Sequence, residues 1–306
     1  MSTVTEVAAG APPVARAAPR AASIRRARRR RVRRGVWNVV GLAVFVVLVF
    51  PVFWMFSTAF KPDTEIHSSS PTWFSIHPTL QHFRDAMARP YFWEVVKNSL
   101  VVVGAVVALS MVVAFLAAVA LAKYRFTGNK LFVVLVIGIL MLPQAGLVIP
   151  LYVVLAKYHL TRGQGVYIGV ILTYMTFALP FAVWTLRGFL LNIPKELEEA
   201  AMVDGSSRVG AFTKILLPLV APGLVATAVF VFITSWNEFI FAYVLLNDQS
   251  KQTITVWLSD FYGTSRQIDW GGLMAGSILA AIPVLVFFVI VQRRIAFGLT
   301  AGAVKG

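Results

Sequence analysis

Few side chains in this sequence are grouped in a way that supports catalysis. The chain contains four histidines and no cysteine, so it offers no thiol nucleophile and no Cys-based metal site. Three of the histidines, His67, His77 and His82, lie close together in the sequence and invite a metal interpretation. No cysteine or paired carboxylate motif accompanies them. The pattern therefore favours solvated side chains, and we predict no metal site.

The sequence also lacks the arrangements that nucleotide hydrolysis and acyl transfer require. No Gly-x-x-x-x-Gly-Lys-Ser/Thr phosphate loop occurs, so the chain is not expected to bind ATP in the manner of a P-loop enzyme. It has neither a nucleophile beside a base nor a carboxylate pair, which argues against a membrane-embedded hydrolase. These absences predict a chain that is not an enzyme and holds no cofactor of its own.

A short, highly charged segment follows a long apolar run and is predicted to form a helix outside the membrane. Pro194 suits the first turn of a helix, and Gly205 suits the left-handed residue that ends one. Between them, Ala200 and Ala201 leave a low-relief face that another backbone can approach closely. We therefore predict a docking helix of about two to three turns. Its charged residues are Lys195, Glu196, Glu198, Glu199 and Asp204.

Glu238 is the one acidic residue that falls inside a predicted membrane span. A carboxylate at the centre of a bilayer costs about 3 kcal/mol, so this side chain is expected to face the bundle interior or a wet cavity. Proton coupling is a weaker interpretation, because no span carries a partner histidine or a second acid. We take Thr234, Asn237 and Glu238 as candidates for lining a translocation path. They belong to a stripe at helical spacing: Thr227, Thr234, Asn237, Glu238 and Phe241.

The composition supports a membrane protein as the frame for these residues. Hydrophobic residues make up 58% of the chain and charged residues only 13%. Several apolar runs reach the roughly 20 residues that a bilayer span needs. The sequence predicts an all-α protein with six transmembrane helices, at 36–57, 95–122, 131–155, 166–186, 222–246 and 271–291.

Polar and proline residues modify three parts of this pattern. Pro143 and Pro150 predict that the third span is bent or broken where a cavity or a neighbour can satisfy its backbone. In the fourth span, Tyr174 and Thr176 either line a path for a solute or serve as ordinary interhelical hydrogen-bond partners. Before the second span, residues 80–87 and 91–98 are predicted to form short amphipathic helices at the outer surface.

The N-terminal segment carries much of the net charge of +15, since ten of the 28 Lys and Arg residues lie in the first 34 positions. Residues 1–35 are predicted to be disordered and to anchor the chain against anionic lipid. RNA binding and a twin-arginine export signal are the alternatives. No small-residue cleavage site follows the apolar run, so we expect the first span to be retained.

The distribution of basic residues predicts the orientation. Most Lys and Arg residues lie on the cytoplasmic side when the N-terminus is placed inside, as the positive-inside rule requires. Both termini and the docking helix are then cytoplasmic, and the loop at 247–270 lies outside.

The docking helix and the segment after it resemble the EAA loop of the membrane subunits of bacterial ABC importers. The pattern is Glu-Ala-Ala, three residues, Gly, nine residues, Ile, one residue, Leu-Pro. Asp204, Phe212 and Pro222 also match the longer form in carbohydrate importers, while Ser206 stands where the family usually has Ala. Segments 236–239 and 298–306 resemble maltose-type permeases as well. The matching positions are Glu199, Ala200, Ala201, Gly205, Ile215, Leu217 and Pro218.

This resemblance implies a type I ABC importer permease with a cytoplasmic coupling helix in the bacterial cell membrane. The implied partners are a second homologous permease, an ABC ATPase dimer that binds ATP and Mg²⁺, an extracytoplasmic sugar-binding protein and membrane lipid, with no nucleic acid. Loop 247–270 would reach toward the binding protein, and the C-terminus would insert between the ATPases. The residues expected to couple to the ATPases are Glu199, Ala200, Ala201, Asp204, Gly205, Ile215, Leu217 and Pro218.

Four segments follow from this interpretation. They are the Arg-rich N-terminus at 1–35, the first transmembrane helix and outer loop at 36–93, the permease domain at 94–292 and a cytoplasmic tail at 293–306. The main alternative is a stand-alone, ion-coupled secondary transporter, which would need intramembrane ionisable pairs and usually an inverted repeat. A non-transporting scaffold is the other alternative, and it would leave the EAA pattern unexplained.

Overall fold

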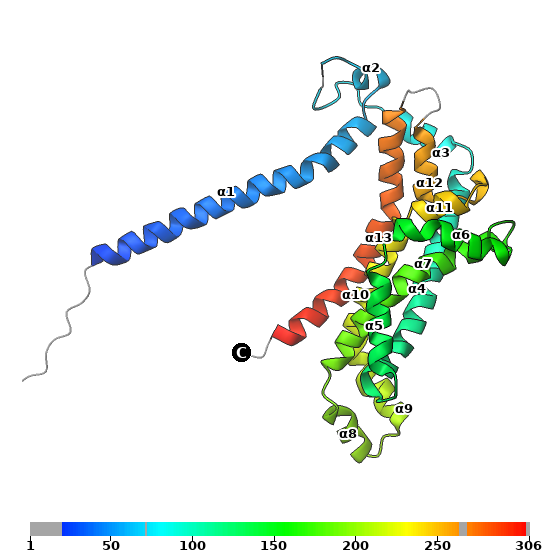
Figure 1. The fold of residues 1–306 in the computed structure, drawn as a ribbon. Coiled ribbons are helices and arrows are strands. Elements are labelled where there is room, and N and C mark those ends of the chain that lie inside the picture. The colour runs from blue at the N-terminus through cyan, green and yellow to red at the C-terminus, as the bar shows by residue number, and fades with distance from the viewer. Residues whose placement is uncertain (1–19, 71, 263–267, 304–306) are drawn as a thin grey trace, which may run out of the picture. The chain divides into compact units, whose positions relative to one another are not determined.

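The computed structural model describes residues 20–70, 72–262 and 268–303 (Figure 1), with side chains between residues 33 and 292 in those ranges. The chain divides into two compact units, residues 1–54 and 55–306. Apart from one isolated antiparallel bridge between Tyr262 and Ile268, the described residues form no β-structure. The predicted all-α class is confirmed.

The long helices are α1 (Arg20–Ala59), α4 (Phe92–Lys123), α7 (Gly165–Leu191), α10 (Leu217–Trp236) and α13 (Trp270–Ala303). Shorter α-helices are α2 (Asp63–Ile66), α3 (Gln81–Ala88), α5 (Asn129–Leu140), α6 (Val148–Lys157), α8 (Glu196–Val203), α9 (Arg208–Ala211), α11 (Ile240–Leu245) and α12 (Ile254–Trp257). Single turns of 3₁₀-helix are η1 (Gln144–Leu147), η3 (Gln249–Lys251) and η4 (Leu258–Phe261), and η2 (Phe212–Leu216) is a π-helix.

Helix α1 contains the predicted first span. Its apolar part, Arg33–Ala59, is long enough to cross a bilayer. The predicted disorder of 1–35 is wrong for residues 20–35, which form the first turns of this helix. Arginine and alanine are good helix formers, so a helix nucleated by the apolar run extends through them. Residues 1–19 lie outside the described part of the chain.

Five helical segments of the described chain are long and apolar enough to span a membrane, or six when a bent pair counts as one span. The bent pair joins Asn129–Leu140 to Gln144–Lys157 at 97°. This confirms the predicted break in the third span. The break lies at Pro143, whereas Pro150 falls in the first turn of α6, where its missing N–H leaves no helical bond unmade.

Two predicted helix boundaries are wrong. Residues 91–98 do not form a separate amphipathic helix, because α4 runs without a break from Phe92 to Lys123. The predicted fifth span at 222–246 begins earlier and ends earlier, since α10 covers Leu217–Trp236 and a new helix starts at Ile240. Pro218 does not delay the start of α10, because it lies at the second position of the helix, where proline is tolerated, whereas Pro222 lies inside the helix.

The core of residues 55–306 is built from α4, α7 and α10, which pack against one another. Small side chains let these helices approach closely, as is usual between transmembrane helices. Ala114 and Ala118 of α4 and Ala182 of α7 are fully buried. In α10, a side chain at Gly223 would lie 2.6 Å from the ring of Phe189, so this contact requires glycine. The close packing makes these three helices the frame on which the other elements are placed.

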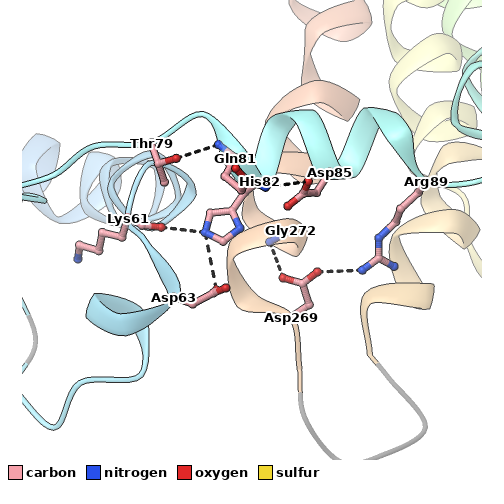
Figure 2. A network of polar contacts seen from close by, with 9 residues as sticks. All are labelled: Lys61, Asp63, Thr79, Gln81, His82, Asp85, Arg89, Asp269 and Gly272. Atoms are coloured by element: carbon pink, nitrogen blue, oxygen red, sulfur yellow. Dashed lines mark hydrogen bonds and ion pairs between the residues drawn. The ribbon is translucent and has the colours of Figure 1, made fainter.

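A polar network holds the end of this unit that carries α2 and α3 (Figure 2). The buried His82 donates from Nε2 to the carbonyl oxygen of Lys61 over 2.8 Å, and the Asp63 carboxylate lies 3.9 Å from the same nitrogen. The imidazole packs on Gly271, where a Cβ atom would lie 2.2 Å from the ring. The predicted solvation of the three histidines is therefore wrong for His82, which joins α3 to α13.

A second connection lies beside the first (Figure 2). Arg89 donates to Asp269 over 2.8 Å, and its guanidinium carbon lies 3.7 Å from the ring centre of Phe261. The other carboxylate oxygen of Asp269 accepts from the N–H of Gly272 over 2.7 Å and so caps the start of α13. The entry into the last span is thereby tied to the residues that precede α4.

Candidate functional site

The predicted docking helix is present as α8, which lies at the opposite end of the second unit from α2, α3 and α12 (Figure 1). Gly205 follows it with a φ of +88°, the left-handed conformation that we predicted. The N–H groups of Gly205 and Ser206 donate to the carbonyls of Met202 and Ala201 over 3.1 and 2.9 Å and close the helix. At the other end, the helix starts at Glu196, two residues after Pro194.

One ion pair fixes α8 to the membrane bundle. Glu198 pairs with Lys123, the last residue of α4, and the two side chains are 26% and 10% exposed. A cavity of about 200 Å³ separates this end of α4 from α8 and η2, and Glu199 and Arg208 are among the residues that line it. Sequence reasoning included Glu198 in the acidic run but gave it no role of its own. Adjacent residues of one turn point in different directions, and only packing shows which one meets α4.

The outer face of α8 is uncovered. None of its residues is buried, and Glu199, Ala200, Asp204 and Gly205 are exposed. Large apolar side chains are exposed beside them, including Val203 at 87% and Val209 at 71%. An exposed apolar surface of this kind at the end of a membrane bundle indicates a contact surface for another protein.

The remaining coupling candidates lie on the path from α8 back into the bundle. Ile215 is half-buried in η2, and Leu217 and Pro218 begin α10. Leu216, between them, is the residue that anchors this segment, because it is almost fully buried. The coupling candidates within 199–205 therefore lie at the tip of the unit, and Ile215, Leu217 and Pro218 lie along the segment that leads from α8 to α10.

Thr234, Asn237 and Glu238 come together in one open pocket of about 490 Å³. It lies among α5, η1, α7, α10 and α11, and Gln144 and Tyr174 also line it. Thr227 does not, since its buried hydroxyl donates to the carbonyl of Gly223 within α10. Of the two polar residues singled out in the fourth span, only Tyr174 reaches the pocket. Thr176 donates to the carbonyl of Leu172 in its own helix.

Glu238 does not lie within a helix, contrary to the predicted stripe. Its two carboxylate oxygens accept from the N–H groups of Phe241 and Ala242 over 2.9 and 3.1 Å and cap α11. The side-chain amide of Asn237 donates to the carbonyl of Ile233 over 2.8 Å at the end of α10. The Glu238 carboxylate supplies acceptors for N–H groups at the start of α11, which explains how a new helix can begin inside an apolar run.

No group of three or more His, Asp or Glu residues within the described ranges is arranged to bind a metal ion. His67 and His77 are exposed, and His82 has the structural partners given above. Gly263, on which the predicted contact with a binding protein was centred, and residues 304–306 of the tail lie outside the described residues.

In the described part of the chain, an open pocket lies among apolar helices, and the short helix α8 is uncovered at one end. This combination defines a subunit that works in membrane transport together with a further protein.

Comparison with known proteins identifies the family. Residues 110–300 match the model of the binding-protein-dependent transport system inner membrane component family, and the chain belongs to this family. The matched range contains both the coupling residues and the pocket. The resemblance based on the EAA pattern is confirmed, and the stand-alone secondary transporter is set aside.

Two relatives with named transport roles illustrate the similarity. The chain is 44% identical over 272 residues to the diacetylchitobiose uptake system permease protein DasC of Streptomyces coelicolor, covering 89% of this chain and 97% of the relative. It is 33% identical over 281 residues to the trehalose/maltose transport system permease protein MalG of Thermococcus litoralis, covering 91% and 99%.

The fold is similar to that of a bacterial ABC transporter involved in the import of the acidic polysaccharide alginate. The TM-score is 0.71 at 20% sequence identity, over 85% of this chain and 95% of the other. A similar chain comes from the alginate ABC transporter in complex with an alginate pentasaccharide-bound periplasmic protein, with a TM-score of 0.65 at 16% identity. The predicted ABC importer permease fold is confirmed.

Proposed function

We propose that this chain is the permease subunit of a bacterial ABC importer that takes up a sugar or oligosaccharide delivered by an extracytoplasmic binding protein. Its partners are a second homologous permease, a dimer of ABC ATPases, the binding protein and membrane lipid, and it binds no nucleic acid. ATP and Mg²⁺ are bound by the ATPases, so the chain itself is not an enzyme and needs no cofactor. The named substrates of DasC and MalG support the sugar assignment.

The observation that carries this proposal is the state of α8, which is fixed to the bundle on one side and uncovered on the other. The Lys123–Glu198 ion pair makes the helix move with α4, and Gly205 ends it sharply. An ATPase that grips the uncovered face would therefore pull on the membrane helices. The coupling residues are Glu199, Ala200, Ala201, Asp204, Gly205, Ile215, Leu217 and Pro218.

The orientation belongs to the same proposal. Both termini lie in the cytoplasm, because this placement brings α8 to the side on which ATP is available and satisfies the positive-inside rule. Loop 247–270 then faces the binding protein. The translocation path passes the pocket that contains Thr234, Asn237 and Glu238.

The test is retention of the ATPase by the purified complex. Glu199→Lys reverses an exposed charge on α8, and we expect it to release most of the ATPase in a pull-down. Glu199→Gln removes the charge without reversing it and is expected to have an intermediate effect. An opposite charge introduced into the ATPase groove should restore part of the binding to Glu199→Lys.

Uptake of labelled neutral, N-acetylated and acidic oligosaccharides in a deletion strain completes the test. We expect one class of sugar to depend on this chain and on the ATPase. If Glu199→Lys kept its ATPase and its transport-linked hydrolysis, the docking role of α8 would be wrong. If no sugar depended on the chain, the assignment to sugar import would be wrong.

A further inference from the structure

Two helix breaks that are far apart in the sequence meet at the same pocket. The first lies between α5 and η1, where Leu140 and Gln144 contribute to the lining. The second lies between α10 and α11, where residues 237–240 contribute. Irregular backbone inside an apolar bundle is tolerated where it lines a cavity, and discontinuous helices mark binding sites in several transporter folds. The meeting of both breaks therefore indicates a ligand site.

One wall of the pocket is aromatic. Phe181 of α7 and Phe230 of α10 stack with their ring centres 3.7 Å apart, and Phe177 and Phe239 also belong to the lining. The apolar C–H face of a pyranose ring packs well on such surfaces, because an aromatic face is both apolar and electron-rich. The volume of about 490 Å³ is within the range of roughly 300–1,000 Å³ that small-molecule sites occupy.

The other part of the lining supplies hydrogen-bonding groups. The hydroxyl of Tyr174 is buried and lies near the Glu238 carboxylate and the side chain of Thr253. Asn237 uses its amide N–H group on Ile233, which leaves its side-chain oxygen to accept from a ligand. Donors and acceptors are thus both present for a ligand rich in hydroxyl groups.

Within the described ranges, the lining of the pocket contains an acidic but no basic side chain. Glu238 is the single charged residue in its lining, and none of the described residues that line it is Lys, Arg or His. Both Glu238 oxygens accept from backbone N–H groups, so the carboxyl group is held in place at the wall of the pocket. An anionic ligand would meet this carboxylate without a counter-charge from the chain. The alginate importer with a similar fold acts on an acidic polysaccharide, so the fold alone does not determine this charge preference.

We infer that this pocket is a sugar-contact site for neutral or amino-substituted oligosaccharides and that Glu238 excludes acidic ones, such as uronates. The inference rests on the proposed function and adds the substrate class. It assigns Glu238 two roles, since the carboxylate both caps α11 and sets the sign of the potential where the sugar passes.

The test uses the absence of cysteine from the chain. Thr234→Cys puts a single thiol into the lining of the pocket, in the assembled permease–ATPase complex in lipid nanodiscs. The rates of modification by a cationic and an anionic methanethiosulfonate reagent are compared by mass spectrometry of this chain. Thr161→Cys is the matched control, because Thr161 lines a different pocket, where Arg162 and Lys251 accompany Asp248.

We expect the cationic-to-anionic rate ratio to be at least about tenfold higher for Thr234→Cys than for Thr161→Cys, as a nearby fixed carboxylate in a partly screened site requires. Adding Glu238→Gln should lower the ratio towards one, since none of the described residues in the lining of the pocket is then charged. Glutamine keeps an acceptor oxygen for the α11 cap. The variant therefore removes the charge while the start of α11 stays capped. A ratio equal to the control, or one that Glu238→Gln leaves unchanged, would overturn the inference.

Protection of the Thr234→Cys thiol then tests the ligand class. Maltotriose or diacetylchitobiose should slow its modification by the cationic reagent several-fold, and tri-galacturonate should not. Protection by tri-galacturonate would overturn the exclusion of acidic sugars, and protection by none of the three would overturn the sugar-contact site. This failure differs from failure of the proposed function. Normal uptake without protection rules out only the pocket as a sugar site, whereas an unaltered chain that supports no sugar uptake and retains no ATPase in the pull-down would rule out the importer.

Discussion

Single residues decide how the exposed helix is shaped and fixed. Gly205 ends α8 at a φ of +88°, and nothing lies within 4 Å of the position that a Cβ atom would occupy. Replacing it therefore introduces backbone strain and a projecting side chain without a clash inside the chain. Lys123 and Glu198 form the ion pair that connects this helix to α4.

Gly205→Asp should abolish uptake at normal expression. A side chain in the left-handed conformation costs roughly 1 kcal/mol, and it would also keep a partner protein from approaching the end of α8 closely. The matched control is Gly128→Asp, since Gly128 has a φ of +96° and equally open surroundings but lies between α4 and α5. Uptake and membrane abundance are measured for both variants. Equal loss of uptake in the two would attribute the effect to strain alone.

Reversing the charge of one member of the Lys123–Glu198 pair should weaken the attachment of α8 to α4, and reversing both charges should restore the attachment. The two side chains are partly buried. Breaking their ion pair should therefore lower the stability by more than the roughly 1 kcal/mol of an exposed pair and by less than the roughly 3 kcal/mol of a buried one. Lys123→Glu and Glu198→Lys should each lower transport-coupled ATP hydrolysis. The double variant Lys123→Glu/Glu198→Lys should recover most of it, and failure to recover would mean that the ion pair does not fix the helix.

At the scale of elements, two interrupted helices distinguish this fold from a bundle of continuous ones. Pro143 explains the interruption after α5, because it lacks the N–H group and restricts the residue before it. The interruption after α10 has no proline. It depends on the side chain of Glu238, which accepts from backbone N–H groups at the start of α11.

Glu238→Ala should destabilise the start of α11. Loss of a helix cap lowers the free energy of unfolding by about 1 kcal/mol, and Ala leaves the N–H groups of Phe241 and Ala242 without their acceptor. Thermal unfolding of the purified complex measures the change. Glu238→Gln is the control and should be more stable than Glu238→Ala. Equal stability of the two variants would contradict a capping role.

At the scale of the whole molecule, the second unit has two functional ends. The uncovered α8 lies at one end, and the connections of His82 and Arg89 secure the other (Figures 1 and 2). The pocket lies within the bundle, where α7 and α10 both contribute to it. A movement of α8 relative to the secured end would thus act on the walls of the pocket through α4, α7 and α10.

Removal of residues 301–306 should lower transport-coupled ATP hydrolysis without changing insertion into the membrane. This prediction rests on the small residues of the tail, its basic flank and the proposed cytoplasmic position near the ATPases. ATP hydrolysis stimulated by the binding protein is measured in the purified complex, and abundance in the membrane is the control. An unchanged rate would show that these residues take no part in coupling.

The sequence by itself determined the class of fold, the exposed helix and the family, because each depends on local or compositional features. Long apolar runs specify membrane helices wherever they occur. A proline and a glycine delimit a short helix through their own backbone preferences, and the EAA pattern is contiguous in the chain.

Only the tertiary structure decided which polar residues act together. Glu238 was predicted to lie within a continuous helix, yet it caps a new one, because its carboxylate competes successfully for backbone N–H groups. His82 was predicted to be solvated, yet it is buried against Gly271, nearly 190 positions away. Glu198 rather than a neighbouring acid meets Lys123. Such pairings depend on how separate helices are oriented against one another, and residue spacing within one helix does not specify that orientation.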